Sequence, residues 1–381
     1  MIASKDASSQ GVDEMLERGR RLRTRRHGDG VGMSKTTGSA VSFATRVKAH
    51  LSIVRLDHSI KNLFVLPGVI VPLSIYPGLM TRHLAGTLVW AFVSITLVAC
   101  SNYVINEVLD APFDRLHPSK KSRPAALGLI SIPAAYAQWI LMMVAGVAIG
   151  WEISKPFAIT ALALWLMGCA YNIQPLRTKD VPYLDVLTES VNNPLRMLLG
   201  WYAVAAWLVP PLSLLMCYWM IGCYFMALKR FSELREIGDR GVAGAYRASF
   251  RRYTPESLLV SVMFYASTAM LFFGAFVIRY RIELLLGFPL VALVMAIYLK
   301  LSFKHDSAVQ NPEKLYRELG LMLWFTATVV VMVTLLFVRL PWLENIFMPT
   351  IPVVQPTSGA ASVSRVLPLR IELRGTGVGE G

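Results

Sequence analysis

Residues 106–123 read N-E-V-L-D-A-P-F-D-R-L-H-P-S-K-K-S-R and join the end of an apolar stretch to a basic tract. On an α-helix, Asn106, Glu107, Asp110 and Asp114 fall within an arc of roughly 100°. Carboxylates on one face at the end of an apolar helix are costly to bury beside lipid, so a counter-charge must stabilise them. A divalent cation shared with substrate phosphates is the partner that this pattern indicates. The simpler alternative is a solvated helix end that carries capping and ion-pair residues.

The composition indicates an integral membrane protein. Of 381 residues, 55% are hydrophobic and 16% are charged, against about 25% charged in a typical soluble domain. Nine apolar stretches are present, several of them close to the ~20 residues that cross a bilayer core. They cover roughly 63–81, 84–105, 131–151, 156–171, 184–208, 211–228, 258–279, 282–299 and 319–340. The stretch at 156–171 is short and 184–208 is interrupted by polar residues. We expect an all-α, polytopic membrane bundle of about nine transmembrane helices.

The net charge of +14 is unevenly distributed. Lys and Arg concentrate before the first stretch and in the alternate loops 114–123, 177–179, 229–252 and 300–317. The positive-inside rule therefore places the N-terminus and these loops in the cytoplasm, for a multi-pass protein of a bacterial inner membrane. The basic excess reports topology first and phosphate binding second, and we do not expect nucleic-acid binding.

The two ends of the chain differ from the bundle. Residues 1–45 are polar and Arg-rich, without the apolar core of a signal peptide, and predict a disordered basic cytoplasmic arm attracted to anionic lipid. Residues 46–342 are predicted to form one transmembrane domain, and 343–381 an irregular tail. The four cysteines lie inside apolar stretches without metal-ligand spacing, which predicts a packing role.

The fifth stretch carries a second polar stripe on about a 100° arc of one helix, formed by Asp185, Glu189, Asn192, Asn193 and Arg196. Such a stripe must face the bundle interior or a wet cavity, because lipid cannot satisfy it. Pro194 lacks an amide proton and favours a kink. The structural alternative is an internal ion-pair network of Arg196 with Glu189 and Asp185.

Further charged residues flank the spans. Lys61 and Asn62 stand where the chain enters the first span, and Lys61 alone could be a snorkelling lysine. The loop after the sixth span, with Lys229, Arg230 and Glu233, is long enough to indicate a lid or a recognition element. Lys229 and Glu233 could also be a plain i,i+4 helix pair.

The two acidic stripes open toward the same basic side, and this arrangement suits a diphosphate. Mg²⁺ would bridge carboxylates and phosphoryl oxygens, and Lys and Arg would neutralise the remaining charge. The chemistry favoured is cleavage of a carbon–oxygen bond to diphosphate.

Four segments resemble the UbiA superfamily of intramembrane prenyltransferases, most closely its decaprenyl-phosphate phosphoribosyltransferase branch. They are R-L-D-H-S-I-K-N-L-F-V-L-P-G from Arg55, N-E-V-L-D-A-P-F-D-R-L-H-P-S-K-K-S-R-P-A-A-L-G from Asn106, the helix of Asp185, and A-L-K-R-F-S-E-L from Ala227. The resemblance covers about residues 46–340. The pattern D-R-x-H-P-x-K-x-x-R-P-x-A-x-G is the most specific part. Glu107 departs from the family, where aspartate is usual.

The resemblance implies roles for individual residues. Metal ligands would come from Asn106, Glu107, Asp110, Asp114 and Asp185, and Asp110, Asp114, Asp185 and Glu189 would be catalytic. Substrate phosphates would contact Lys61, Asn62, Asn106, Arg115, Lys120, Lys121, Arg123, Arg177, Lys179, Asn192 and Arg196. The closing loop would add Lys229, Arg230 and Glu233.

The leading hypothesis is therefore Mg²⁺-dependent transfer of phosphoribose from phosphoribosyl pyrophosphate to a polyprenyl phosphate. The product would be a lipid-linked precursor of an arabinose-type pentose donor for a surface or exported glycan. The alternative is prenyl transfer from a polyprenyl diphosphate to an aromatic or other small acceptor. A non-enzymatic transporter is the third reading, although no internal repeat supports it. Polyprenyl length, and whether the protein is a homo-oligomer, stay open.

Overall fold

The computed structural model describes residues 42–115, 120–310 and 312–347. Most of the predicted basic arm and of the predicted C-terminal tail lies outside these residues. All regular secondary structure in the described part of the chain is helical. The α-helices are α2 (Phe43–Ser52), α3 (Leu66–Ile75), α4 (Arg82–Asp114), α5 (Ile132–Ile153), α6 (Lys155–Asn172), α7 (Leu184–Ser190), α8 (Asn192–Val204), α9 (Leu212–Ile237), α10 (Arg240–Tyr246), α11 (Pro255–Tyr280), α12 (Phe288–Ser302), α13 (Leu319–Phe337) and α14 (Pro341–Ile346). The 3₁₀ segments are η2 (Leu56–Val65), η3 (Pro77–Leu79), η4 (Lys120–Ser122), η5 (Thr178–Asp180), η6 (Ala248–Arg251), η7 (Ile282–Gly287), η8 (Ala308–Gln310) and η9 (Pro312–Arg317).

Each of the nine predicted spans coincides with helical structure. In the described residues, six helical segments are long and apolar enough to cross a bilayer: α4, α5, α9, α11, α13, and η7 with α12 taken together. The other three are the first, fourth and fifth. The first consists of η2 and the short α3, the fourth is the 18-residue α6, and the fifth is divided into α7 and α8. The fourth span is the stretch that is short in the sequence, and the fifth is the stretch that is interrupted by polar residues.

The length of α4 explains where its acidic groups lie. Its 33 residues, at 1.5 Å each, make a helix about 50 Å long, whereas the hydrocarbon core is about 30 Å thick. The polar side chains from Asn102 to Asp114 occupy its C-terminal part. The helix can therefore span the bilayer with its apolar part and carry its acidic residues toward the membrane surface.

The fifth span is interrupted at Val191, between α7 and α8. Pro194 lacks an amide proton, so it cannot donate the helical hydrogen bond to the carbonyl of Ser190. The proline predicted a kink, and the structure has a one-residue interruption at Val191, which keeps helical backbone angles (φ −62°, ψ −20°). Glu189, Ser190 and Asn192 flank this interruption and line a cavity.

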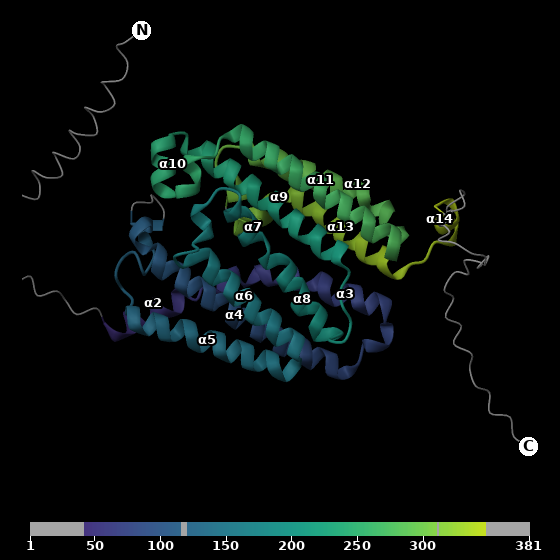
Figure 1. The fold of residues 1–381 in the computed structure, drawn as a ribbon, viewed down its shortest axis with the longest axis horizontal. Coiled ribbons are helices and arrows are strands. Elements are labelled where there is room, and N and C mark those ends of the chain that lie inside the picture. The colour runs from purple at the N-terminus through teal and green to yellow at the C-terminus, as the bar shows by residue number, and fades with distance from the viewer. Residues whose placement is uncertain (1–41, 116–119, 311, 348–381) are drawn as a thin grey trace, which may run out of the picture.

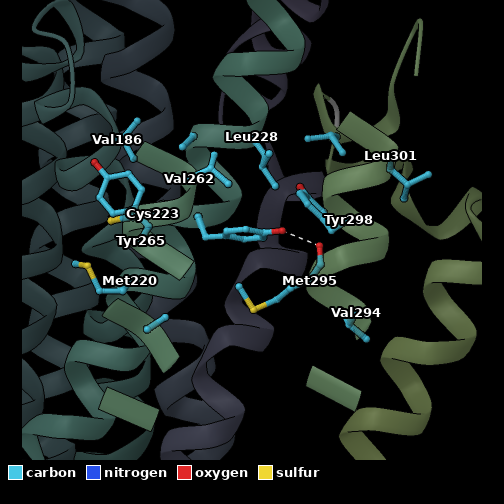
Figure 2. Packing of buried hydrophobic residues seen from close by; sticks show 14 of the residues in the cluster. Val186, Met220, Cys223, Leu228, Val262, Tyr265, Val294, Met295, Tyr298 and Leu301 are labelled. Atoms are coloured by element: carbon cyan, nitrogen blue, oxygen red, sulfur yellow. Dashed lines mark hydrogen bonds between the residues drawn. The ribbon is translucent and has the colours of Figure 1, made fainter. Parts of the chain in front are cut away.

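The helices pack in two groups around α8 (Figure 1). α4, α5 and α6 pack together on one side, and α9, α11, α12 and α13 on the other, while α8 contacts α3, α4, α6 and α9. In the second group, residues of α9 and α11 pack against Val294, Met295, Tyr298 and Leu301 of α12 (Figure 2). The hydroxyl of Tyr224 on α9 donates to the carbonyl of Met295, 2.6 Å away. These contacts join α9 to α12, and both helices contribute residues to the wall of the cavity described below.

The ends of α4, α6 and α9, which carry the charged side chains of the predicted site, lie at the same end of the bundle. α10 and α2 lie at the left end in Figure 1, and α14 lies at the opposite end. At the left end, η5 packs against η6, and Lys120 of η4 contacts Tyr246 of α10. The loops after α4, α6 and α9 therefore come together, as the charge pattern predicted.

Candidate active site

A cavity of about 390 Å³ lies inside the bundle, within the size range of ligand pockets. Its polar lining comes from η2, α4, α6, α7, α8 and α9 and includes Lys61, Asn102, Asn106, Tyr171, Asn172, Glu189, Asn192, Asn193, Arg196 and Lys229. Apart from Tyr298, the wall formed by α12, α13 and Leu315 is apolar, with Val294, Leu321, Met322 and Phe325. Asn106 and Glu189, one from each predicted stripe, both reach this cavity. Such a cavity suits a ligand with an ionic head and a hydrocarbon chain.

The first stripe runs along α4 at four-residue intervals, through Asn102, Asn106, Asp110 and Asp114. Asn106 and Asp110 both accept hydrogen bonds from Lys179 of η5, at 3.3 and 2.5 Å. Lys179 also donates to the side-chain oxygen of Asn172, 3.0 Å away. Burial lowers the pKa of Lys179, and the neighbouring carboxylate of Asp110 opposes that shift. Three helix-borne oxygens thus converge on one buried ammonium group.

Arg177 completes this group. Its guanidinium lies 3.3 Å from Asp110 and 2.8 Å from Asp180, and it donates to the carbonyl of Asn172 at 3.2 Å. Arg177 has a φ of 26°, outside the usual region for a residue with a side chain. These contacts hold the turn that carries Lys179 against α4 and α6.

The last acid of the stripe, Asp114, pairs with Arg123 at 2.7 Å. Two other residues of this region instead hold the loop backbone. Glu107 is buried and accepts from the amide of Ala125 at 3.4 Å, and Arg115 donates to the carbonyl of Ala126 at 2.9 Å. Lys121 is exposed. Of the residues predicted here, Asn106 lines the cavity, and the metal and phosphate roles of Glu107, Arg115 and Lys121 stay predictions.

The second acidic group is centred on Asp185, which is fully buried. One carboxylate oxygen accepts from the Tyr253 hydroxyl at 2.7 Å. The other accepts from Arg230, Arg247 and Ser249 at 3.1 to 3.3 Å. Asp185 does not line the cavity. Its predicted role as a metal ligand stays untested, and its observed contacts anchor the loop after α9 to α7.

Lys229, Arg230 and Glu233 were predicted to lie in the loop after the sixth span, but they lie in α9, which continues to Ile237. Arg230 binds three carboxylates at once. Besides Asp185, it contacts Glu189 at 2.7 Å and Glu233 at 3.0 Å. Glu189 also accepts from the Tyr171 hydroxyl at 2.8 Å. The structural alternative considered for this stripe was an ion-pair network of Arg196 with Glu189 and Asp185. The guanidinium of Arg196 instead donates to Asn62 of η2 at 3.3 Å and to the carbonyl of Asn192 at 3.4 Å.

The end of α6 joins the two acidic groups. Asn172 accepts from Lys179 in the first group, and the neighbouring Tyr171 accepts from Arg230 and Arg247 in the second, at 3.3 and 3.2 Å. Lys120 bridges from the other side, because it contacts Tyr246 and its charge interacts with Glu233 and Asp114. Burial lowers the pKa of Lys120, and Glu233 opposes the shift. The predicted loops and stripes therefore form one connected polar region.

Three basic residues lie deeper, in the cavity lining: Lys61, Arg196 and Lys229. Asn62 supports Arg196 and is itself held by a hydrogen bond to Thr96 at 3.0 Å. The ammonium of Lys61 lies 5.9 Å from the ring centroid of Tyr103. Glu189 is the only carboxylate among the lining residues, so this part of the cavity is positively charged and attracts anions.

Several polar residues of the region were missed in the sequence. Asn102 extends the four-residue spacing by one turn, which was a readable signal. Its amide donates to the carbonyl of Leu164 at 3.1 Å, and its oxygen has no hydrogen-bond partner among the described residues. The buried oxygen of Asn192 also lacks such a partner. Tyr171, Asn172, Arg247 and Tyr253 had no comparable signal, because their partners are distant in sequence.

The side-chain oxygens around Lys179 are of the chemical type that binds Mg²⁺. Asn106, Asp110 and Asn172 offer the hard oxygen ligands that Mg²⁺ prefers, but these oxygens surround the Lys179 ammonium. In the described residues, no group of three His, Cys, Asp or Glu side chains is placed to hold a metal. A divalent cation would therefore depend on amide or substrate oxygens as well as on carboxylates.

Comparison with known proteins supports the predicted UbiA-like helical bundle. The chain is 31% identical to the decaprenyl-phosphate phosphoribosyltransferase of Mycolicibacterium smegmatis over 59% of this chain and 68% of that protein. It is 31% identical to the nodulation protein NoeC of Azorhizobium caulinodans over 41% of this chain and 49% of that protein. A UbiA homologue from Archaeoglobus fulgidus, solved with GPP and Mg²⁺, matches with a TM-score of 0.57 at 19% identity, covering 74% of this chain and 99% of that one.

Residues 65–327 match the UbiA prenyltransferase family. The match covers most of the helical bundle, including both acidic stripes and the cavity lining apart from Lys61 and Phe64. This chain belongs to the UbiA prenyltransferase family and is a multi-pass membrane transferase.

Proposed function

We propose that this protein transfers phosphoribose from phosphoribosyl pyrophosphate to a polyprenyl phosphate. The observation that carries the proposal is the presence of two separate groups of cations. Lys61, Arg196 and Lys229 line the cavity, whereas Lys179 and Arg123 lie against the end of α4. A reaction between two phosphorylated substrates needs two anion sites, whereas prenyl transfer to a neutral acceptor needs one.

The cavity supports a distinct place for each substrate. The lipid phosphate would lie against Lys61, Arg196 and Lys229, with its chain along the apolar wall of α12 and α13. The diphosphate of the donor would lie near Asp110, Lys120 and Lys179. The unpaired oxygens of Asn102 and Asn192 would accept hydrogen bonds from ribose hydroxyl groups. A hydrocarbon chain would leave them unsatisfied, which costs free energy.

The reaction would break the bond between ribose C1 and the diphosphate oxygen. Diphosphate would leave with the bonding electrons, and an oxygen of the lipid phosphate would form the new bond to C1. This nucleophile is already ionised at neutral pH, so the step needs no strong general base. Mg²⁺ held by Asp110 with Asn106 and Asn172 would supply charge stabilisation for the departing diphosphate. Glu189 would face the positive charge that develops on the sugar.

The chain's own residues would contribute position and charge. Lys61, Arg196 and Lys229 would hold the lipid phosphate close to C1 despite the repulsion between two anions, an effect of proximity as well as charge. Similarity to the mycobacterial phosphoribosyltransferase supports this choice of substrates. The product would be a precursor of an arabinose-type donor for a surface or exported glycan. The N-terminus would face the cytoplasm of a bacterial inner membrane.

A labelled-donor assay tests the proposal. Purified protein with Mg²⁺, decaprenyl phosphate and labelled phosphoribosyl pyrophosphate should produce a labelled, acid-labile lipid. Asp110→Asn should reduce turnover by roughly 100-fold. Glu152→Gln, an exposed acid on α5, is the matched control and should retain activity. The absence of labelled lipid with a folded protein would overturn the proposal.

Prenyl transfer is the second candidate, because the apolar wall of the cavity would equally hold the chain of a polyprenyl diphosphate. The same protein would then convert a labelled polyprenyl diphosphate and an aromatic acceptor to product without phosphoribosyl pyrophosphate. Running both assays on one preparation distinguishes the two reactions.

A further inference from the structure

The ammonium of Lys179 has the surroundings of a bound cation. Its nitrogen lies 2.5 Å from Asp110 Oδ1, 3.0 Å from Asn172 Oδ1 and 3.3 Å from Asn106 Oδ1. An ammonium has three protons to donate, so these three oxygens match its whole hydrogen-bonding capacity. Lys179 is 5% exposed. The lysine is therefore held in place rather than extended into solvent.

The surrounding contacts orient both the oxygens and the lysine. The side-chain nitrogen Nδ2 of Asn172 donates to the carbonyl of Gly168 at 2.9 Å, which directs its side-chain oxygen toward Lys179. Arg177 fixes the turn that carries the lysine through Asp180, at 2.8 Å, and Asp110, at 3.3 Å. The position of the ammonium is thus built from α4, α6 and η5 together.

Mg²⁺ and Lys179 need the same atoms. Mg²⁺ takes oxygen ligands at about 2.1 Å in a tight octahedral shell. The ammonium occupies the space between the oxygens, and two positive charges at one site repel strongly in a buried environment. The four-carbon stem of a lysine allows its ammonium to move to another anion without movement of the backbone. A substrate diphosphate is such an anion.

We propose that Lys179 competes with the divalent cation for the oxygens of Asn106, Asp110 and Asn172. The site then binds the metal ion alone weakly and binds it more tightly together with a diphosphate, whose oxygens receive the displaced ammonium. The order of binding follows from this competition, since metal enters with the diphosphate rather than before it. The proposal concerns the leaving group only and is independent of whether a sugar or a lipid carries it.

The test measures Mn²⁺ binding to the full-length protein in detergent by electron paramagnetic resonance, without either organic substrate. Lys179→Met should bind Mn²⁺ at least tenfold more tightly than the wild type. Lys48→Met is the control, because it removes an exposed positive charge from α2 and leaves the three oxygens untouched. It should change the affinity by less than threefold. Equal affinities for Lys179→Met and the wild type would overturn the proposal.

If Lys179→Met does not fold, a second experiment on the wild-type protein tests the same competition. Lys179 is labelled with an amine-acylating reagent over a Mn²⁺ titration and quantified by mass spectrometry. Labelling of Lys179 should rise at least threefold in parallel with bound Mn²⁺. Binding of Mn²⁺ with unchanged labelling would contradict competition. Neither readout depends on transfer activity, so failure here is distinct from failure of the proposed reaction.

Discussion

Substitution of Gly168 by alanine tests the packing that places Asn102 in the cavity. A Cβ on Gly168 would lie 2.2 Å from Cγ of Asn102 and 2.3 Å from both its amide nitrogen and its oxygen. The Asn102 side chain would have to move and would lose its 3.1 Å hydrogen bond to Leu164. Gly168 is therefore required because two helices approach closely at this point.

The cost can be worked from these contacts. Overpacking costs about 1–3 kcal/mol and loss of the hydrogen bond about 1 kcal/mol, while alanine in a helix recovers about 0.5–1 kcal/mol. The net destabilisation is about 2 kcal/mol, equivalent to a decrease of roughly 4–8 °C in Tm. Thermal unfolding in detergent, followed by intrinsic tryptophan fluorescence, measures it.

A double-mutant cycle makes this prediction specific. Asn102→Ala removes the atoms that the new methyl group meets, so the double variant should be more stable than additivity predicts, by about 1–2 kcal/mol. Gly274→Ala is the control, because a Cβ there meets nothing within 4 Å. It should leave Tm unchanged or slightly higher. Additive effects of Gly168→Ala and Asn102→Ala, or equal effects of Gly168→Ala and Gly274→Ala, would refute the reasoning.

Three further predictions concern charge. Arg230→Met leaves Asp185, Glu189 and Glu233 without their shared partner and should lower the stability by about 3–5 kcal/mol; a loss below about 1 kcal/mol in thermal unfolding would contradict the buried network. Burial lowers the pKa of Lys120, so Lys120 loses its positive charge at a lower pH than an exposed lysine. The KM for phosphoribosyl pyrophosphate should therefore rise on the alkaline side, and Lys120→Arg should move this rise to higher pH; identical pH profiles would exclude the role. Chelation by EDTA should abolish transfer and added Mg²⁺ should restore it, as measured by labelled lipid product, whereas activity in excess EDTA would exclude a metal requirement.

The positions of the helices followed from sequence because lipid imposes a strong constraint. Apolar stretches of sufficient length must be helical in a bilayer, and the interruption near Pro194 follows from its missing amide proton. The spacing of Asn106, Asp110 and Asp114 placed them on one face of α4 by helical geometry alone. Residues whose surroundings are set within one helix were therefore predictable.

Contacts between helices were not predictable in the same way. Asp185 pairs with Arg230 and Arg247, from α9 and the loop that follows, whereas the structural alternative considered from sequence paired it with Arg196 on the same stripe. The choice depends on which helix packs beside α7, and spacing along one helix does not contain this information. Lys179 was recognised as a basic loop residue, but its three oxygen partners come from two helices and meet only after both pack.

The pairing of acids with resident bases also explains how the region can be charged and buried at once. Asp110, Asp114 and Asp185 each have a Lys or Arg within 3.3 Å, so each of these three carboxylates already has a counter-charge within the protein. Breaking such a pair is costly, but exchanging one partner for another ion is less so. Under the proposed function, an incoming diphosphate would bring charges that replace the acids as partners of Lys179 and Arg123, and Mg²⁺ would replace the bases as partner of Asp110. Substrate binding would then be an exchange of ion pairs, which predicts that a diphosphate and its metal bind more tightly together than either alone.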